Sequence, residues 1–357
     1  MNAVDSITPA IEHTRQQLFK PFRIGQWTKL AFVGLLAGEL GSSGLSRSNF
    51  SPPTQPGLPH IDLPSPLGTG LELNPAVVAA LVAGVIAMLA IGVIMLYVGS
   101  VMRFILFDSI LERECHIRWD WSRRLGPGWH YFVWKLLYLL FSVVGIGVVV
   151  GIPLAVAFAK GWLKEPNAHL PALVLGGAIL LFVLLTFLLA TAVILVLTKD
   201  FVIPQMALEN VDVMEGWRRF WPMMQADMGA YAGYIVMKIV LNIIVGIMIG
   251  IAALILGLFF VVPTLGLSIL AVVTGKTAGL TWNVYTITLA VVVGFILLAF
   301  FLYLVSLISV PAIVFFPAYS IYFFASRYPR LSSALYSASS AAQALSGALP
   351  SPSPPSL

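Results

Sequence analysis

Charged side chains are scarce in this sequence, and cysteine is almost absent. Only 10% of the 357 residues are charged and 59% are hydrophobic, whereas a typical soluble domain has about 25% charged residues. This composition excludes a soluble globular chain, because no stretch between the hydrophobic segments is long enough to bury a core of its own. The single cysteine, Cys115, excludes an intramolecular disulfide.

Motifs that carry chemistry are also missing. The five histidines show no His-x-x-x-His or Glu-x-x-His spacing, so the sequence predicts no metal site. Phosphate-binding loops of the Gly-x-x-x-x-Gly-Lys-Ser/Thr type, Gly-x-Ser-x-Gly elbows and Cys-x-x-Cys pairs do not occur. We therefore expect a protein without catalytic residues and without a cofactor.

What the sequence has instead is a series of long uncharged runs. A bilayer core about 30 Å thick is crossed by about 20 residues of helix, and backbone groups in lipid must be hydrogen-bonded within the chain. The fold we expect is all-α, with six transmembrane helices and an outer connection at 263–282. The predicted spans begin near 24–29 and end near 45 for the first, and then cover about 76–106, 130–158, 171–198, 230–262 and 282–311.

The basic residues indicate an orientation. All but four of the 20 Lys and Arg residues fall on one side of this topology, the exceptions being Arg47, Lys160, Lys164 and Lys276. The positive-inside rule then places both termini in the cytoplasm. A basic surface beside a membrane favours anionic lipid headgroups as partners over nucleic acid.

The chain divides into three parts by composition. Segment 1–26 mixes charged with apolar residues, which predicts a cytoplasmic amphipathic helix on the inner leaflet. Residues 27–330 form the predicted six-helix membrane domain, whose extracytoplasmic Pro-rich loop covers 46–75. Residues 331–357 are predicted to be a disordered cytoplasmic tail.

Two similar segments each follow a predicted span. Phe104–Glu112 and Phe201–Glu209 are both followed by a basic aromatic stretch, Trp121–Pro127 and Trp217–Pro222 respectively. Leu18–Pro21 offers a partial third copy. We interpret the chain as three pseudo-repeated units, each a cytoplasmic amphipathic segment followed by a transmembrane hairpin.

Glycine spacing supports this interpretation. The odd-numbered predicted spans each carry Gly-x-x-x-Gly, which places two glycines on one helix face and allows a neighbouring helix to approach closely. The pairs are Gly34/Gly38, Gly147/Gly151 and Gly246/Gly250.

Polar residues inside the predicted spans are few. Glu39 is the only carboxylate there, and an intramembrane carboxylate is a candidate proton or cation site. The surrounding glycines favour the alternative that the first span ends early and that Glu39 lies at the outer interface. Lys238 and Asn242 share one face of the fifth span, and Lys238 is expected to reach the cytoplasmic headgroups.

Arginine pairs beside tryptophan are the candidate lipid contacts. Arg with interfacial Trp fits contact with phospholipid headgroups at the cytoplasmic surface, although topology alone would explain the same residues. The residues are Arg123, Arg124, Arg218 and Arg219, with Trp121 and Trp217.

Three segments carry a family resemblance. Leu18–Phe32, Val202–Val211 and Trp217–Trp221 resemble a broad group of bacterial six-span membrane proteins, which includes the membrane domain attached to some glycerophosphoryl diester phosphodiesterases. In those enzymes the chemistry belongs to a separate barrel with a His-Arg-Gly type motif, and this chain has neither. The resemblance implies the architecture, a bacterial inner-membrane location and an association with lipid metabolism or envelope upkeep, without hydrolase activity.

The expected function is that of a non-enzymatic inner-membrane protein, in envelope- or lipid-related transport or as a scaffold. Its candidate partners are membrane lipids and a protein at the cytoplasmic face. One alternative is a secondary transporter or channel for a small solute, because interrupted helices such as the glycine-broken first span mark transport sites. A membrane-embedded lipid enzyme is the other alternative, which the missing polar cluster disfavours.

Overall fold

The computed structural model describes residues 2–20, 22–39, 75–162, 168–277 and 284–336. Every regular element within these ranges is a helix, as the sequence predicts. Helices satisfy their backbone groups without a partner strand, which suits long runs that lack charge. The long helices are α4 (Pro75–Leu111), α5 (Ile117–Ala159), α6 (Leu170–Leu197), α9 (Met228–Thr277) and α10 (Val284–Ile308).

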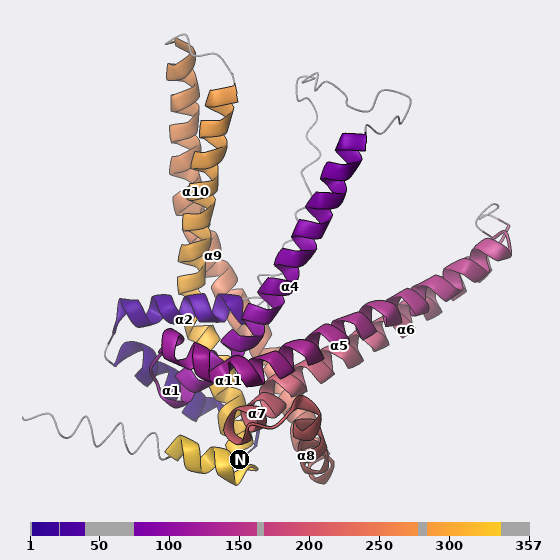
Figure 1. Ribbon diagram of the computed structural model, residues 1–357, viewed down its shortest axis with the longest axis vertical. Coiled ribbons are helices and arrows are strands. Elements are labelled where there is room, and N and C mark those ends of the chain that lie inside the picture. Colours follow the sequence, from indigo (N-terminus) through magenta and orange to yellow (C-terminus); the bar gives the residue numbers. More distant parts are fainter. Residues whose placement is uncertain (1, 21, 40–74, 163–167, 278–283, 337–357) are drawn as a thin grey trace, which may run out of the picture.

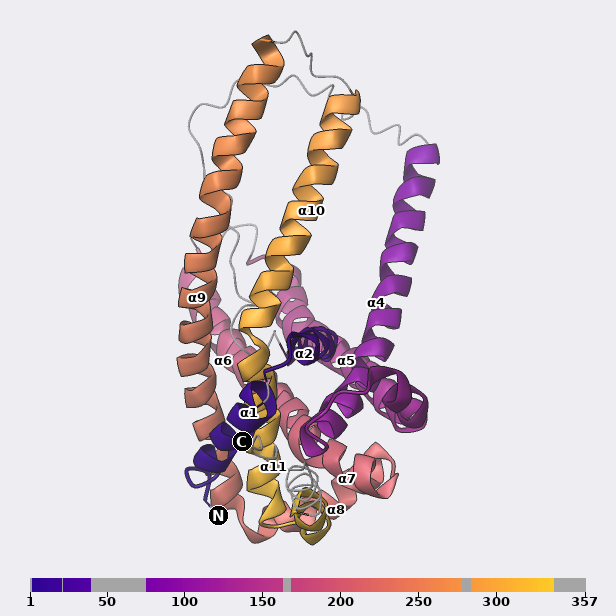
Figure 2. The ribbon, with the colours of Figure 1, turned by 90° about the vertical axis from the view of Figure 1, so that its left-hand side faces the viewer.

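These five helices are long and apolar enough to cross a membrane. Most of their large apolar side chains are exposed on the protein surface, which is unfavourable in water and favourable in lipid. The chain is therefore embedded in a membrane. Figure 1 shows α5 beside α6 and α9 beside α10 as two hairpins that diverge from each other, with α4 between them. Figure 2 shows that α4, α9 and α10 extend in one direction from a common base.

Shorter helices build this base, together with the adjoining ends of α4, α5 and α9. Together these segments carry most of the buried aromatic and aliphatic side chains of the core. They are α1 (Ile7–Phe19), α2 (Ile24–Leu36), the π-helical turn η2 (Thr198–Val202), α7 (Ile203–Glu209), α8 (Val213–Ala226) and α11 (Val310–Ala325).

The centre of the base is an aromatic cluster around Phe201. Its ring centroid lies 5.2 Å from that of Phe220, 5.0 Å from Tyr234 and 5.2 Å from Phe324. Complete burial of such a side chain contributes about 1.5–3 kcal/mol. α11 is buried on nearly all sides, which explains why it is apolar without an amphipathic pattern.

The predicted first span appears in part, as a short helix. α2 has 13 residues, about 20 Å of helix at about 1.5 Å per residue, which is too short to cross a bilayer core. Gly38 follows with a positive φ of +79°, so the helix does not continue through it. Figures 1 and 2 show α2 running across the direction of α9 and α10. The rest of the predicted span, 40–45, and nearly all of loop 46–75 lie outside the described residues.

Several other boundaries differ from the predicted ones. α9 continues through Pro263 to Thr277, where a connection was expected from 263, because a membrane helix tolerates proline. α5 starts at Ile117 and joins the amphipathic segment to its span in one helix. The predicted end of the last span at 311 lies just after a break between α10 and α11, with Pro311 in the first turn of α11.

The predicted disordered tail is wrong at its beginning. Residues 329–336 form a helical segment, and the side chains of Leu331 and Leu335 are buried in the base. Two leucines four residues apart share a helix face and remove their apolar surface from solvent. The tail beyond residue 336 lies outside the described part of the chain.

Gly34, one glycine of the predicted pairs, allows close helix packing. A Cβ atom at Gly34 would lie 2.7 Å from Cδ1 of Ile313 on α11. Gly38 serves as the helix end, and Gly147, Gly151 and Gly250 have no atom near the position of a Cβ. The prediction of close packing is therefore wrong within this chain for those four glycines, because three of them lie on the two diverging hairpins, α5–α6 and α9–α10.

Helix α1 is attached to the base by polar contacts. The Gln17 side chain donates to the Ser109 carbonyl oxygen at 2.8 Å, and the Tyr319 hydroxyl donates to the Ala3 carbonyl oxygen at 3.0 Å. The buried Nδ1 atom of His13 lies 3.3 Å from the Tyr322 hydroxyl. Burial, aided by the positive charge of Arg113, lowers the pKa of His13 to about 4.

Replacing Gly34 with alanine should destabilise the protein by about 1–3 kcal/mol, because Ile313 must move to accept the added methyl group. Gly25→Ala is the matched control, since it lies on the same helix with open space around it and should be neutral or stabilising. Thermal unfolding in detergent micelles measures the stability of both variants. Equal effects of the two substitutions would contradict the packing of α2 on α11.

Acid should weaken the folded state through His13. The unfolded chain binds a proton at a pKa of about 6.5 and the folded chain only at about 4, so stability falls as pH drops through this window. The loss is on the order of 3 kcal/mol for this group. His13→Gln should flatten the pH dependence of the unfolding temperature, and the exposed His130→Gln should leave it steep. An unchanged slope in His13→Gln would disprove the assignment.

Candidate functional site

Five charged side chains from four parts of the chain meet inside the base. The Glu39 carboxylate pairs with the Arg103 guanidinium on α4 and with the Lys199 ammonium on η2, the latter at 2.7 Å. The Asp200 carboxylate pairs with the Lys238 ammonium on α9. We call these five residues the buried ionic network. Glu39 and Asp200 are almost fully buried, with 2% and 1% of their side chains exposed.

A tyrosine completes one half of the buried ionic network. The Tyr234 hydroxyl, one helical turn before Lys238, donates to Oδ2 of Asp200 at 3.0 Å. The Lys238 ammonium also lies 5.7 Å from the centre of the Tyr234 ring, a favourable cation–π distance. Asp200 is therefore held by a charged donor and a neutral donor, both from α9.

Neighbouring residues of the π-helical turn η2 contact different partners. Lys199 and Asp200 are adjacent in sequence, yet Lys199 contacts Glu39 and Asp200 contacts Lys238. Single π turns inside α-helices occur frequently at functional sites. The Trp217 indole N–H donates to the Thr198 hydroxyl at 3.1 Å, so α8 supports the start of this turn.

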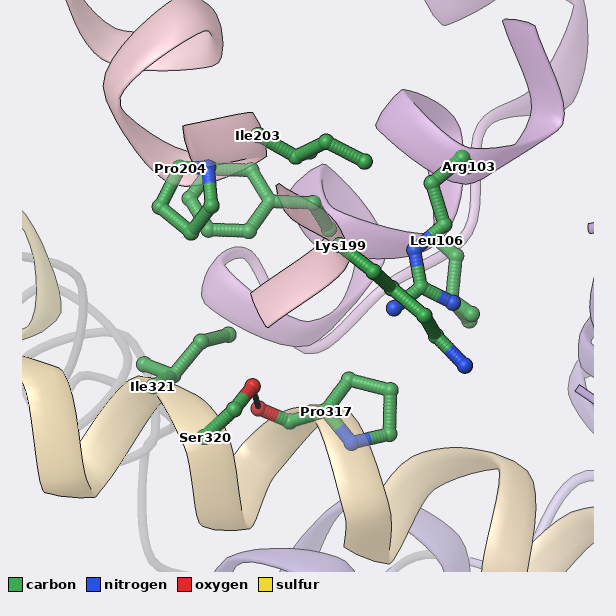
Figure 3. A pocket seen from close by; sticks show the side chains of 9 residues that line it. Arg103, Leu106, Lys199, Ile203, Pro204, Pro317, Ser320 and Ile321 are labelled. Carbon is green, nitrogen blue, oxygen red and sulfur yellow. Dashed lines mark hydrogen bonds between the residues drawn. The ribbon is translucent and has the colours of Figure 1, made fainter. Parts of the chain in front are cut away.

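A small cavity adjoins the network. Figure 3 shows Arg103 and Lys199 extending past each other above Pro317 and Ser320 of α11. The cavity volume is about 10 Å³, room for about one water-sized particle. Apart from Arg103, Lys199 and Ser320, its lining is apolar.

A second buried ion pair lies deeper in the base. Nε and Nη2 of Arg124 each donate to a carboxylate oxygen of Asp108 at 2.6 Å, and Nη1 donates to the Ala207 carbonyl oxygen at 2.8 Å. Bidentate pairs of this kind are among the stronger polar contacts in proteins. The pair connects α4, α5 and α7.

The prediction of lipid contact is wrong for Arg124, because its side chain is buried against Asp108. Trp121 and Trp217 are partly buried and pack against the core. Arg123, Arg218 and Arg219 are exposed, and each also pairs with a carboxylate: Glu112 at 3.9 Å, Glu215 at 2.7 Å, and Glu209, respectively. A surface hollow of about 460 Å³ lies over α8 and is lined by Met214, Glu215, Trp217, Arg218 and Trp221.

The predicted intramembrane polar residues have different roles from those expected. Glu39 is buried beside Arg103 and Lys199, both of which the basic-residue pattern assigns to the cytoplasmic side, so Glu39 cannot lie at the outer interface in that topology. Lys238 turns inward to Asp200 instead of reaching the headgroups. Asn242 lies on the same helix without joining the network, and its side-chain oxygen accepts no hydrogen bond within the described structure.

Sequence reasoning missed Arg103, Lys199 and Asp200. Each stands within or directly after an uncharged run, where a charge also fits a simple topology signal. One signal in the sequence is the Lys-Asp dipeptide at 199–200. An acidic residue directly beside a basic one offsets its positive charge, so the positive-inside rule alone does not explain why both are there. No group of three potential metal ligands occurs in the part of the chain that the structure describes.

An apolar groove opens on the side of the base. α1 forms one wall with Ile11, Thr14, Arg15 and Phe19, and the volume is about 420 Å³, within the range of about 300–1,000 Å³ typical of ligand pockets. The other walls come from α9, α10 and α11. Their lining residues are Val245, Met248, Ile249, Ala252, Ile308, Pro311, Ala312 and Phe315. We call this the lateral groove.

Removing the Asp200 charge should strongly destabilise the protein, because Lys238 would remain buried without its counter-charge. Asp200→Asn should cost about 3–5 kcal/mol, and adding Lys238→Met should restore part of that loss. The exposed Asp212→Asn is the control and should change stability by less than about 0.5 kcal/mol. A double-mutant cycle on thermal unfolding measures the coupling, and additive effects would contradict the pairing.

The comparisons with known proteins add a family. Residues 1–334 match a family model described as "Family of unknown function (DUF7544)". No curated protein and no solved structure matches the chain. Because the match covers nearly all of the base and all five long helices, the chain belongs to the DUF7544 family.

Proposed function

We propose that this protein is a non-enzymatic inner-membrane protein with a lipid-related role, in which the lateral groove holds an acyl chain of a membrane lipid. The observation that carries the proposal is the groove itself. It is almost wholly apolar and lies between an amphipathic helix, α1, and the lipid-facing helices α9 and α10. Hydrocarbon surrounds those helices, so the acyl chain of a membrane lipid is the apolar ligand present at the highest concentration beside the groove.

One wall of the groove is suited to the polar part of the same lipid. Thr14 and Arg15 of α1 line it, and the Arg15 side chain is 63% exposed and only loosely paired with Glu12, at 3.8 Å. A guanidinium in this position can contact a phosphate. Lys20 follows at the end of α1, and both charges favour an anionic headgroup.

The proposal also includes the orientation of the chain in the membrane, the number of spans and their repeats. We place the base on the cytoplasmic side of a bacterial inner membrane with both termini there, because the basic residues concentrate on this side of the sequence topology. Six spans in three pseudo-repeated units and the resemblance to the glycerophosphoryl diester phosphodiesterase membrane domain stay predictions. In this orientation, the hollow over α8 faces the headgroups or a protein partner at the cytoplasmic surface.

A secondary transporter or channel is the second candidate. The buried ionic network favours it, because ionisable residues inside membrane proteins mark ion and substrate pathways by default. The lipid proposal ranks first because the lateral groove is large enough for a ligand, whereas the cavity beside the network admits only one water-sized particle.

Filling the lateral groove should abolish lipid binding there. Ala252→Trp introduces a bulky ring into the groove from α9, whereas Ala253→Trp makes the same change at the next position, outside the groove lining. Phospholipids with a photoreactive acyl chain should cross-link to 245–252 and 308–315 in the parent protein and in Ala253→Trp, and several-fold less in Ala252→Trp. Cross-links that are uniform along all five long helices in every variant would refute the site.

A further inference from the structure

The buried ionic network does not balance its charges. Three cations, Arg103, Lys199 and Lys238, face two anions, Glu39 and Asp200. Within the described residues the network therefore carries an excess of positive charge on side chains that are mostly buried. An uncompensated buried charge is costly.

The excess is located at Arg103 and Lys199. Asp200 is occupied by Lys238 and by the Tyr234 hydroxyl, so that half of the network is neutral. Glu39 serves two cations with one negative charge. The cavity of Figure 3 lies against these same two cations and is otherwise lined mainly by apolar side chains of α4, α7 and α11.

We propose that this cavity binds one small monovalent anion of halide size, which lies against Arg103 and Lys199 on the side of these two cations that Glu39 does not occupy. One negative charge neutralises the excess of the network, and a spherical ion needs no further hydrogen-bond geometry. The cavity volume of about 10 Å³ excludes polyatomic anions such as phosphate, because it accommodates about one water-sized particle. The Lys199 side chain is 21% exposed, which gives an ion a route of entry.

This site shares no lining residue with the lateral groove of the lipid proposal. The cavity uses Pro317 and Ile321 of α11 where the groove uses Pro311 and Phe315. Loss of lipid binding and loss of anion binding can therefore be measured separately in one protein.

The test compares halides with a bulky anion. Full-length protein in detergent is unfolded thermally in sodium chloride, sodium bromide or sodium gluconate at matched ionic strength. A ligand that binds only the folded state raises the unfolding temperature in a saturable way. We expect chloride and bromide to do so relative to gluconate, and crystals grown with bromide to show its anomalous signal in the cavity that Arg103 and Lys199 line.

Two pairs of variants separate a site from a general salt effect. Lys199→Met removes the excess charge and should lose the halide response, whereas Lys160→Met, exposed near the end of α5, should keep it. Ser320→Leu fills the cavity and should also lose the response, whereas Ser320→Ala should retain it. Two results would overturn the proposal. One is a saturable halide response that persists in Lys199→Met. The other is an unfolding temperature of the parent protein that depends on salt concentration in the same way in chloride and in gluconate.

Discussion

The structure depends on one constraint, the need to satisfy charges that are buried within membrane-associated helices. The buried ionic network joins the segment just after α2, the buried part of α4, η2 and α9. Burying any one of these charged side chains alone in a medium of low polarity is unfavourable. The cost is offset only when the side chains of opposite charge are in place. The position of four distant segments is therefore set by a single cluster, with the aromatic residues around Phe201 filling the space beside it.

The base is stabilised by different interactions from the five long helices that extend from it, which we call the arms. In the base, buried aromatic and ionic side chains of the described residues contact each other. In the arms, helix pairs make few polar contacts, such as the Tyr138 hydroxyl donating to the Thr191 carbonyl oxygen at 2.9 Å. Their outer faces, including Gly147 and Gly151, contact nothing in the described chain. Lipid must supply the contacts there, which is why apolar side chains can remain exposed.

The sequence predicts the arms well and the site poorly. Five of the six predicted spans correspond to long helices that could cross a membrane, since helix length in a membrane follows directly from the absence of charge. Arg124 shows the limit of this reasoning: a topology signal and a buried ion pair look the same in sequence, and only the position of Asp108 separates them. Glu39 was identified as a candidate, but its partners are separated from it by many residues, and no periodicity reveals contacts between segments. The same holds for α2, whose length depends on where Gly38 ends the helix.

The two candidate sites share their supporting helices although they share no lining residue. α9 carries Lys238 of the buried ionic network and, two turns later, Val245 of the lateral groove. α11 contributes Pro311 to Phe315 to the groove and Pro317 to Ile321 to the cavity. A displacement of either helix changes both sites, because packed helices move as rigid elements. Coupling between the two sites must then act in both directions: whatever a lipid in the groove does to anion affinity, an anion in the cavity does equally to lipid affinity.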